Sequence, residues 1–223
     1  MLQLKQLVSH FPHRWQTELK RIHFGRQINR KKFVTDEPEY KILHKLISPG
    51  DWVLDVGANL GHYTNKFSEL VGPHGRVIAF EPVPTTFFLL SANTQRFTYS
   101  NVTLINVAVS DSVDIVGISI PKFSTGLTNY YQAHISSTTD SALSVFTLSL
   151  DSLNINQRIA LVKIDAEGHE PFVLTGMQKL IKKYHPTLII ENPSEEIIAN
   201  LIFMDYVSEI LPSSPNVLFK QKV

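Results

Sequence analysis

Apolar residues in the first half of the chain fall into two alternating patterns. Short continuous apolar runs at residues 52–56, 76–80 and 102–106 are bounded by turn-forming residues, which predicts buried strands. Between them, apolar residues recur at helical spacing over residues 60–71 and 84–97. The resulting order of strand, helix, strand, helix and strand predicts a parallel sheet with right-handed crossovers.

The middle of the chain departs from this order. Two runs with a strand-like pattern, residues 115–120 and 144–150, enclose a stretch rich in Ser, Thr, Asn and Gly from Phe123 to Ser141. We interpret this region as an antiparallel excursion with a long polar loop. Because long loops in compact domains are commonly functional, we expect residues 121–142 to contribute to a substrate pocket.

The alternation returns in the last third of the chain. A strand at residues 160–164 is followed by one helix, whose buried stripe runs from residue 173 to residue 181, and by a strand at residues 187–190. Residues 206–211 and 217–220 then indicate a terminal antiparallel pair of strands.

The N-terminal segment differs in charge from the remainder. Residues 1–34 carry eight Lys or Arg and a single acidic residue, and apolar residues between Phe11 and His23 lie near helical spacing. We therefore divide the chain into a helical, basic extension over residues 1–37, packed on the domain, and a main domain over residues 38–223. Two other interpretations of the extension stay open: a lid over an anionic substrate and a contact with a membrane surface.

Composition narrows the class of protein. The 223 residues are 43 % hydrophobic and 18 % charged, as in soluble globular domains. The formal net charge of +1 provides no overall field for nucleic acid, and the lack of cysteine excludes disulfides and thiolate metal sites. The N-terminus lacks a signal peptide's apolar core, and no apolar run approaches the roughly 18 residues that span a bilayer. We expect a cytoplasmic protein without stable membrane insertion.

The turn after the first strand contains Gly57 and Gly61, which let a ligand approach backbone N–H groups at a helix N-terminus. A dinucleotide-binding loop would place another glycine where Asn59 stands. Asp55 would repel a pyrophosphate but accept a hydrogen bond from an ammonium group, and Glu81, after the second strand, can accept both ribose hydroxyls. These charges favour S-adenosyl-L-methionine over NAD as the cofactor.

Four motifs in this order resemble the FkbM family of S-adenosylmethionine-dependent methyltransferases. The motifs are Asp55–Gly61, Phe80–Pro82, Asn106–Asp111 and Lys163–Glu170. The resemblance covers about residues 38–207. It implies an α/β, Rossmann-like methyltransferase fold: a mostly parallel twisted sheet with a terminal antiparallel strand pair and helices on both faces. It also implies methyl transfer to a hydroxyl oxygen of a small molecule, such as a sugar or a secondary-metabolite or glycan precursor.

The resemblance further implies which residues surround the methyl donor. The expected cofactor-binding residues are Asp55, Gly57, Ala58, Asn59, Gly61, Glu81, Asn106, Ala108 and Asp165. Within this set, Asn106 and Ala108 are expected near the adenine, and Asp165 is expected to face the methyl-transfer centre.

An alcohol is a poor nucleophile near neutral pH, so we expect a general base among Asp165, Glu167 and His169. Glu167 belongs to the family's Asp-x-Glu-Gly-x-Glu pattern, whereas His169 replaces a commonly small residue and inherits no family role. Two structural alternatives stay open: Asp165 as a cap of the following helix, and His62 and His169 as residues that only line helix starts. A metal held by Asp165 and nearby carboxylates is another mechanism. The sequence shows no compact ligand cluster, so we expect no metal.

Two other functions stay open at this stage. One is an NAD-dependent oxidoreductase, against which Asn59 and Asp55 argue. The other is a non-catalytic protein that binds S-adenosylmethionine without turnover. The expected partner is a small-molecule acceptor, with a sugar or nucleotide-linked sugar suggested by the basic N-terminal segment. We expect no nucleic acid partner.

Overall fold

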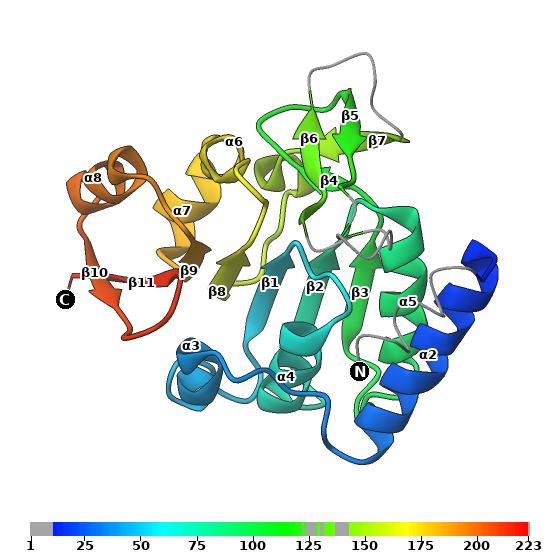
Figure 1. The fold of residues 1–223 in the computed structure, drawn as a ribbon. Coiled ribbons are helices and arrows are strands. Elements are labelled where there is room, and N and C mark those ends of the chain that lie inside the picture. Colours follow the sequence, from blue (N-terminus) through cyan, green and yellow to red (C-terminus); the bar gives the residue numbers. More distant parts are fainter. Residues whose placement is uncertain (1–10, 122, 124–128, 130–131, 137–142, 223) are drawn as a thin grey trace.

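Seven strands form a central sheet in the order β10-β11-β9-β8-β1-β2-β3 (Figure 1). They are β1 Trp52–Val56, β2 Arg76–Phe80, β3 Val102–Ile105, β8 Ile159–Ile164, β9 Thr187–Glu191, β10 Tyr206–Ile210 and β11 Asn216–Gln221. The first five pair in parallel, whereas β11 runs antiparallel to both β9 and β10. This computed structural model describes residues 11–121, 123, 129, 132–136 and 143–222. The mostly parallel sheet with a terminal antiparallel pair is confirmed.

Helices cover both faces of this sheet (Figure 1). They are α2 His13–Asn29, α3 Pro38–Ile42, α4 His62–Val71, α5 Pro84–Thr94, α6 Glu170–Thr175, α7 Gln178–Tyr184 and α8 Glu195–Phe203, with 3-10 turns at Leu43–Lys45 and Leu150–Leu153. Successive residues of β1 enter different layers: Val53 shares a core cluster with α3 and α4, whereas Leu54 shares one with α6, α7 and α8. Burial on both faces explains why the strands appear in the sequence as continuous apolar runs.

A second, smaller sheet has the order β4-β7-β5-β6 and lies beyond the carboxyl ends of the central strands (Figure 1). Its strands are β4 Ala108–Val109, β5 Ile115–Ser119, β6 His134–Ser136 and β7 Leu143–Leu148. The antiparallel pairing of β5 with β7 confirms the expected excursion. The short strands β4 and β6 were not expected, because two or three residues are too few to show a period. Parts of the predicted polar loop lie outside the described residues.

Two helices differ from the sequence prediction. The single helix expected across residues 173–181 is two helices, α6 and α7, which meet at Gly176. A Cβ at Gly176 would lie 2.0 Å from the carbonyl oxygen of Ser110, so a close backbone approach at this point interrupts the helix. The apolar residues Tyr40, Leu43, Leu46 and Ile47 have helical spacing, yet this segment forms only the short helix α3 and a 3-10 turn.

Helix α2 packs along α5 near the β3 side of the sheet (Figure 1). Its inner face contributes Phe24 and Ile28 to a small cluster with Phe33, Leu60 and Leu89. Among the residues that the structure describes, none of the helices is long and apolar enough to cross a bilayer.

Candidate active site

The carboxyl ends of four neighbouring strands, β9, β8, β1 and β2, bring acidic residues together. Asp55 lies near the end of β1, Glu81 follows β2, Asp165 follows β8 and Glu191 ends β9. The chain winds from β1 toward β3 on one side and from β8 toward β9 on the other, so the strand order reverses between β1 and β8. Ligands of open α/β sheets bind at such a reversal. The fold therefore places these carboxylates where a ligand site is expected.

The loop after β1 depends on glycine. Gly57 has a φ of +77°, and a Cβ there would lie 1.8 Å from the carbonyl oxygen of Asp165. The N–H groups of Gly57 and Ala58 donate to the Phe80 carbonyl oxygen at 3.0 and 2.9 Å, which fixes the loop to β2. Gly61, with a φ of +94°, precedes α4. The loop is thus held tightly against both β2 and the end of β8.

Glu81 is buried and accepts two backbone hydrogen bonds. The N–H groups of Asn59 and Val83 each donate to it at 2.9 Å. Burial raises the pKa of Glu81 to about 7. The Asn106 side chain donates to the carbonyl oxygens of Glu81 and Pro82 at 2.7 and 3.0 Å, so it braces the turn that carries the carboxylate.

Two cavities open beside this loop. The first, of about 250 Å³, extends from Glu81, Val83 and Ala108 to the carboxylates that follow β8 and β9. The second, of about 510 Å³, is lined by residues that include Asp55, Asn59, His62, Tyr63 and Lys163. Four residues line both cavities: Glu37, Gly57, Asn59 and Asp165. A single extended ligand can therefore pass over the glycine loop from one cavity to the other.

Asp55 lines the second cavity and has one unpaired oxygen. Its side chain is fully buried, and Oδ2 accepts from the Thr64 hydroxyl at 2.6 Å. Its Oδ1 is buried and has no partner. Burial raises the pKa of Asp55. Because an unpaired buried acceptor is costly, a donor group of a ligand would stabilise this position.

Lys163 is the buried cation of the site. Its Nζ lies 2.8 Å from Asp165 Oδ2 and 4.6 Å from the centre of the Tyr63 ring. Burial lowers the pKa of Lys163, but the carboxylates of Asp165 and Asp55 outweigh it, and the net pKa is raised. Burial raises the pKa of Asp165. The positive charge of Lys163 and a hydrogen bond from Glu191 outweigh this effect, so the net pKa of Asp165 is lowered. Lys163 therefore stays charged, and Asp165 stays a carboxylate.

Glu191 and Glu167 complete a group of three carboxylates with Asp165, whose oxygens lie within 4.8 Å of one another. Burial and the hydrogen bond to Asp165 raise the pKa of Glu191 to about 8. The raised pKa favours the protonated form of Glu191, whose O–H donates a hydrogen bond to the Asp165 carboxylate. Three oxygen ligands also suit Mg²⁺ or Ca²⁺. The expectation of no compact ligand cluster was therefore wrong, because Asp165 and two nearby carboxylates form one.

Comparisons with known proteins agree with this geometry. The family model for the methyltransferase FkbM domain matches residues 55–206. This chain belongs to the FkbM methyltransferase family. The match extends from the carboxylate before the glycine loop to the first residue of β10, so it contains Asp55, Glu81, Asp165 and Glu191.

Individual relatives of this FkbM-family chain are distant. It is 28 % identical over 142 residues to the hexuronic acid methyltransferase AglP of Haloferax volcanii, covering 62 % of this chain and 55 % of AglP. It is 48 % identical over 50 residues to the 31-O-demethyl-FK506 methyltransferase FkbM of Streptomyces tacrolimicus, 22 % of this chain and 19 % of that protein. The chain thus spans just over half of AglP and about a fifth of FkbM.

The fold also matches a solved family structure. The methyltransferase FkbM from Methylobacillus flagellatus KT superposes with a TM-score of 0.58 at 17 % identity, covering 81 % of this chain and 50 % of that one. At this identity the likeness shows the fold, which is the Rossmann-like methyltransferase fold expected from the motifs.

The structure brings most of the sequence-predicted residues to the two cavities. The predicted residues that line a cavity are Asp55, Gly57, Ala58, Asn59, Glu81, Ala108, Asp165, Glu167 and His169. Gly61 and Asn106 instead shape the loop and the turn behind it. Asp165 is not a helix cap, because α6 begins at Glu170 with His169 before it.

The two histidines have well-defined surroundings. His169 Nε2 lies 2.9 Å from the Ser110 hydroxyl, and its ring stacks on Phe172 at 4.5 Å. Burial lowers the pKa of His169, so the ring at the cavity wall is neutral. His62 stacks on Phe33 at 3.9 Å, and burial lowers its pKa to about 4. His62 thus lines the second cavity as a neutral ring.

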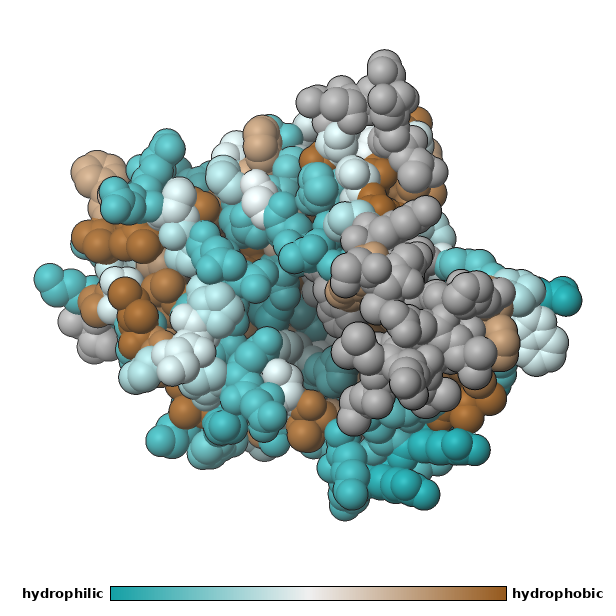
Figure 2. All heavy atoms as spheres, viewed as in Figure 1, coloured by the Kyte–Doolittle hydropathy of each residue, from teal (hydrophilic) through white to brown (hydrophobic). Residues whose placement is uncertain are grey.

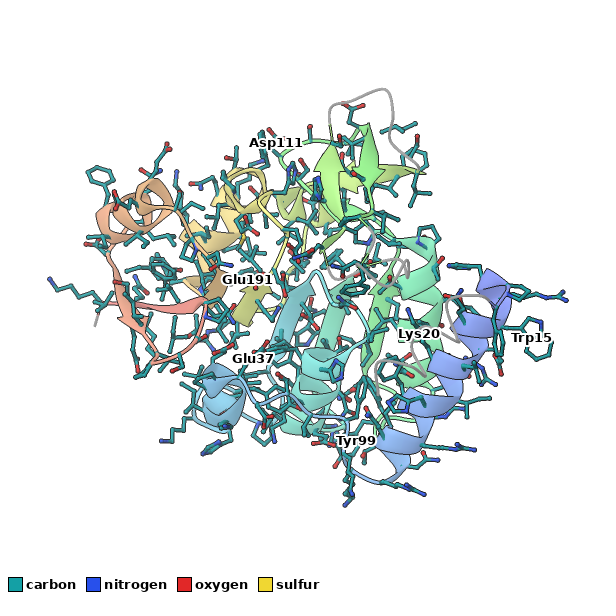
Figure 3. The ribbon with its side chains drawn as sticks, in the orientation of Figure 1. Trp15, Lys20, Glu37, Tyr99, Asp111 and Glu191 are labelled. Carbon is teal, nitrogen blue, oxygen red and sulfur yellow. The ribbon has the colours of Figure 1, made fainter. Side chains whose placement is uncertain are left out.

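Three residues of the site were not predicted from the sequence: Glu37, Lys163 and Glu191. Glu37 precedes α3 and accepts from the Tyr63 hydroxyl, which also lies 2.8 Å from the buried Glu39. Figure 3 labels Glu37 and Glu191, which come from opposite ends of the chain and line the same cavity. Only Glu191 carried a signal, because acidic residues end several of the predicted strands.

Proposed function

We propose that this chain transfers a methyl group from S-adenosyl-L-methionine to a hydroxyl oxygen of a small molecule. The observation that carries the proposal is a pair of buried carboxylates, one in each of the two adjoining cavities. Glu81 lines the first cavity with two N–H donors already bound, and Asp55 lines the second with Oδ1 unpaired. Glu81 fits the ribose hydroxyls and Asp55 the ammonium group of one ligand.

The residues present fit this donor. Glu81 would hold the ribose, the glycine loop the methionine portion, and Asp55 with Glu37 the ammonium. Val83 and Ala108 give the first cavity an apolar wall suited to an aromatic base. When bound, S-adenosylmethionine supplies a sulfonium-activated methyl group.

Asp165 is the proposed general base. It lines both cavities, stays ionised beside Lys163, and lies at the junction where a reacting hydroxyl would sit. Asp165 would accept the proton of the acceptor hydroxyl, whose oxygen would take the methyl group that S-adenosylmethionine supplies, with S-adenosylhomocysteine as the leaving group. Lys163 and Glu191 hold this carboxylate in place from two sides. Positioning both substrates supplies much of the rate enhancement.

The proposed acceptor is a small molecule such as a sugar. The names of two relatives, a hexuronic acid methyltransferase and a 31-O-demethyl-FK506 methyltransferase, support this class. Residues after β5 contribute Ala133 and Ile135 to the first cavity, so the small sheet provides part of the acceptor side.

Calorimetry and turnover together test the proposal. We expect S-adenosylhomocysteine to bind and NAD not to bind. Incubation with donor carrying a labelled methyl group and a panel of sugars should give one labelled product and stoichiometric S-adenosylhomocysteine. Binding of NAD without S-adenosylhomocysteine would refute the donor. Binding without turnover on any acceptor would favour the non-catalytic alternative.

A further inference from the structure

The outer face of α2 carries an apolar stripe that stays partly exposed in the part of the chain that the structure describes. Trp15, Leu19 and Ile22 are spaced four and three residues apart, and they are 55 %, 42 % and 38 % exposed. Phe11, just before the helix, extends the line and is 44 % exposed. Figure 3 shows Trp15 pointing away from the domain.

This stripe is distinct from the face that holds α2 in place. Phe24 and Ile28 lie on the opposite side and pack into the cluster that contains Phe33. A surface helix in a globular domain normally has one apolar stripe, directed at the core. Two opposed stripes indicate that α2 lies between the domain and a second apolar environment.

Helix α2 and the residues that follow it concentrate positive charge. Residues 11–35 contain seven Lys or Arg and one Glu, in a chain whose net charge is only +1, so the remainder is net negative. Arg26 has the helical spacing of the apolar stripe, Arg30 follows the last residue of α2, and Arg14, Lys31 and Lys32 lie near the two ends of the helix; all five are exposed. Figure 2 shows hydrophilic side chains gathered at the lower end of α2, where residues 26–32 lie. A binding partner that matches this face of α2 must therefore be anionic at its surface and apolar beneath that surface.

We propose that the outer face of α2 docks peripherally on an anionic lipid bilayer. Trp15, Leu19 and Ile22 enter the boundary between headgroups and acyl chains, while the arginines contact lipid phosphates. The net negative remainder of the chain turns the basic face toward the membrane. A second copy of this chain fits less well, because a symmetric pairing through α2 would bring two basic faces together.

Vesicle co-sedimentation of the full chain tests this inference. We expect vesicles of phosphatidylcholine with phosphatidylglycerol to bind the protein at least about tenfold more tightly than pure phosphatidylcholine, with strong salt dependence. The double variant Trp15→Ser/Ile22→Ser should lose at least about tenfold of that affinity. The variant Arg26→Gln/Arg30→Gln should lose several-fold and show a weaker salt dependence.

Matched controls separate this surface from general effects. Phe203→Ser removes an aromatic side chain that is 91 % exposed on α8, and Lys179→Gln/Lys182→Gln removes two charges from α7. Both should bind vesicles like the unchanged protein, and thermal unfolding should show that all variants are folded. The inference fails if the protein ignores anionic vesicles at low salt, or if the controls lose as much binding as the α2 variants. It also fails if light scattering shows a dimer that Trp15→Ser/Ile22→Ser dissociates.

Discussion

The two walls of the active site are built in different ways. The donor wall, from Asp55 to Glu81, comes from one short segment and is held by backbone hydrogen bonds, such as those from Asn59 and Val83 to Glu81. The charged wall combines Glu37, Lys163, Asp165 and Glu191, which come from distant parts of the sequence. Asp165 contacts Lys163 and Glu191, and Glu37 accepts a hydrogen bond from Tyr63, whose ring lies under Lys163. The donor wall is therefore set by local backbone geometry, whereas the charged wall depends on the complete sheet.

Replacing Gly57 by Ala should distort the glycine loop of the donor wall. We expect this substitution to have the largest effect on donor binding. The new Cβ would meet the Asp165 carbonyl oxygen at 1.8 Å, and the φ of +77° adds strain on the order of 1–2 kcal/mol. We expect no measurable binding of S-adenosylhomocysteine by calorimetry and a large loss in thermal stability.

Gly72→Ala is the control for this prediction. Gly72 also has a positive φ, +66°, but nothing lies within 4 Å of a Cβ there. It should show only the backbone strain and keep donor binding. Equal effects of the two substitutions would mean that the close approach to Asp165 is unimportant.

The same contrast explains what could be predicted from the sequence. The strands of the central sheet, their order along the chain and the donor wall follow from patterns within about thirty residues. The joining of Glu191 to Asp165 requires β9 to pair beside β8 with Ile164 opposite Ile190, which no local pattern reveals. Glu37 is placed by Tyr63, and the break between α6 and α7 by Ser110, both far away in the sequence.

Asp165→Asn should remove the proton acceptor of the charged wall and leave donor binding at the donor wall largely unchanged. The amide keeps the shape of the side chain but cannot accept a proton. We expect methyl transfer to fall by about 10²- to 10⁴-fold, with S-adenosylhomocysteine affinity changed far less. Single-turnover transfer and calorimetry on the same preparation measure the two quantities.

Glu167→Gln serves as the comparison, because Glu167 is the exposed member of the carboxylate group. It should cost less than Asp165→Asn if proton acceptance is the important step. A chelator should leave transfer unchanged in this mechanism. Loss of transfer with chelator, restored by a divalent ion, would instead assign the three carboxylates to a metal.

The pH dependence of donor binding should follow the titration of Glu81, the buried carboxylate of the donor wall. Burial raises the pKa of Glu81 to about 7, so below that pH the group gains a proton and loses an acceptor oxygen. The dissociation constant of S-adenosylhomocysteine should rise about tenfold per pH unit below about pH 7 and level off above it. Glu81→Gln should bind more weakly at every pH and show a flat profile. A sloping profile in that variant would assign the titration to another group.

A substitution of Glu37 should have the smallest and most selective effect on donor affinity, because Glu37 lies where the donor wall and the charged wall meet. It lines both cavities and is partly exposed, and its carboxylate is fixed by the Tyr63 hydroxyl. Glu37→Gln keeps that hydrogen bond and removes only the charge. We expect about a tenfold loss in affinity for S-adenosylhomocysteine, the scale of one charge-assisted hydrogen bond.

The probe that makes this prediction decisive is 5′-methylthioadenosine, which has the adenosine and the thioether but no amino-acid portion. Its affinity should be the same for Glu37→Gln and for the unchanged protein, because only the ammonium contact is lost. Asp36→Asn removes the same charge one residue earlier, from an exposed side chain on the second cavity. If Asp36→Asn weakens S-adenosylhomocysteine equally, the effect is a general field rather than a contact. If Glu37→Gln weakens both ligands, Glu37 supports the loop that carries Asn59 instead of binding the donor. Glu37 would then not be a donor-binding residue of the charged wall.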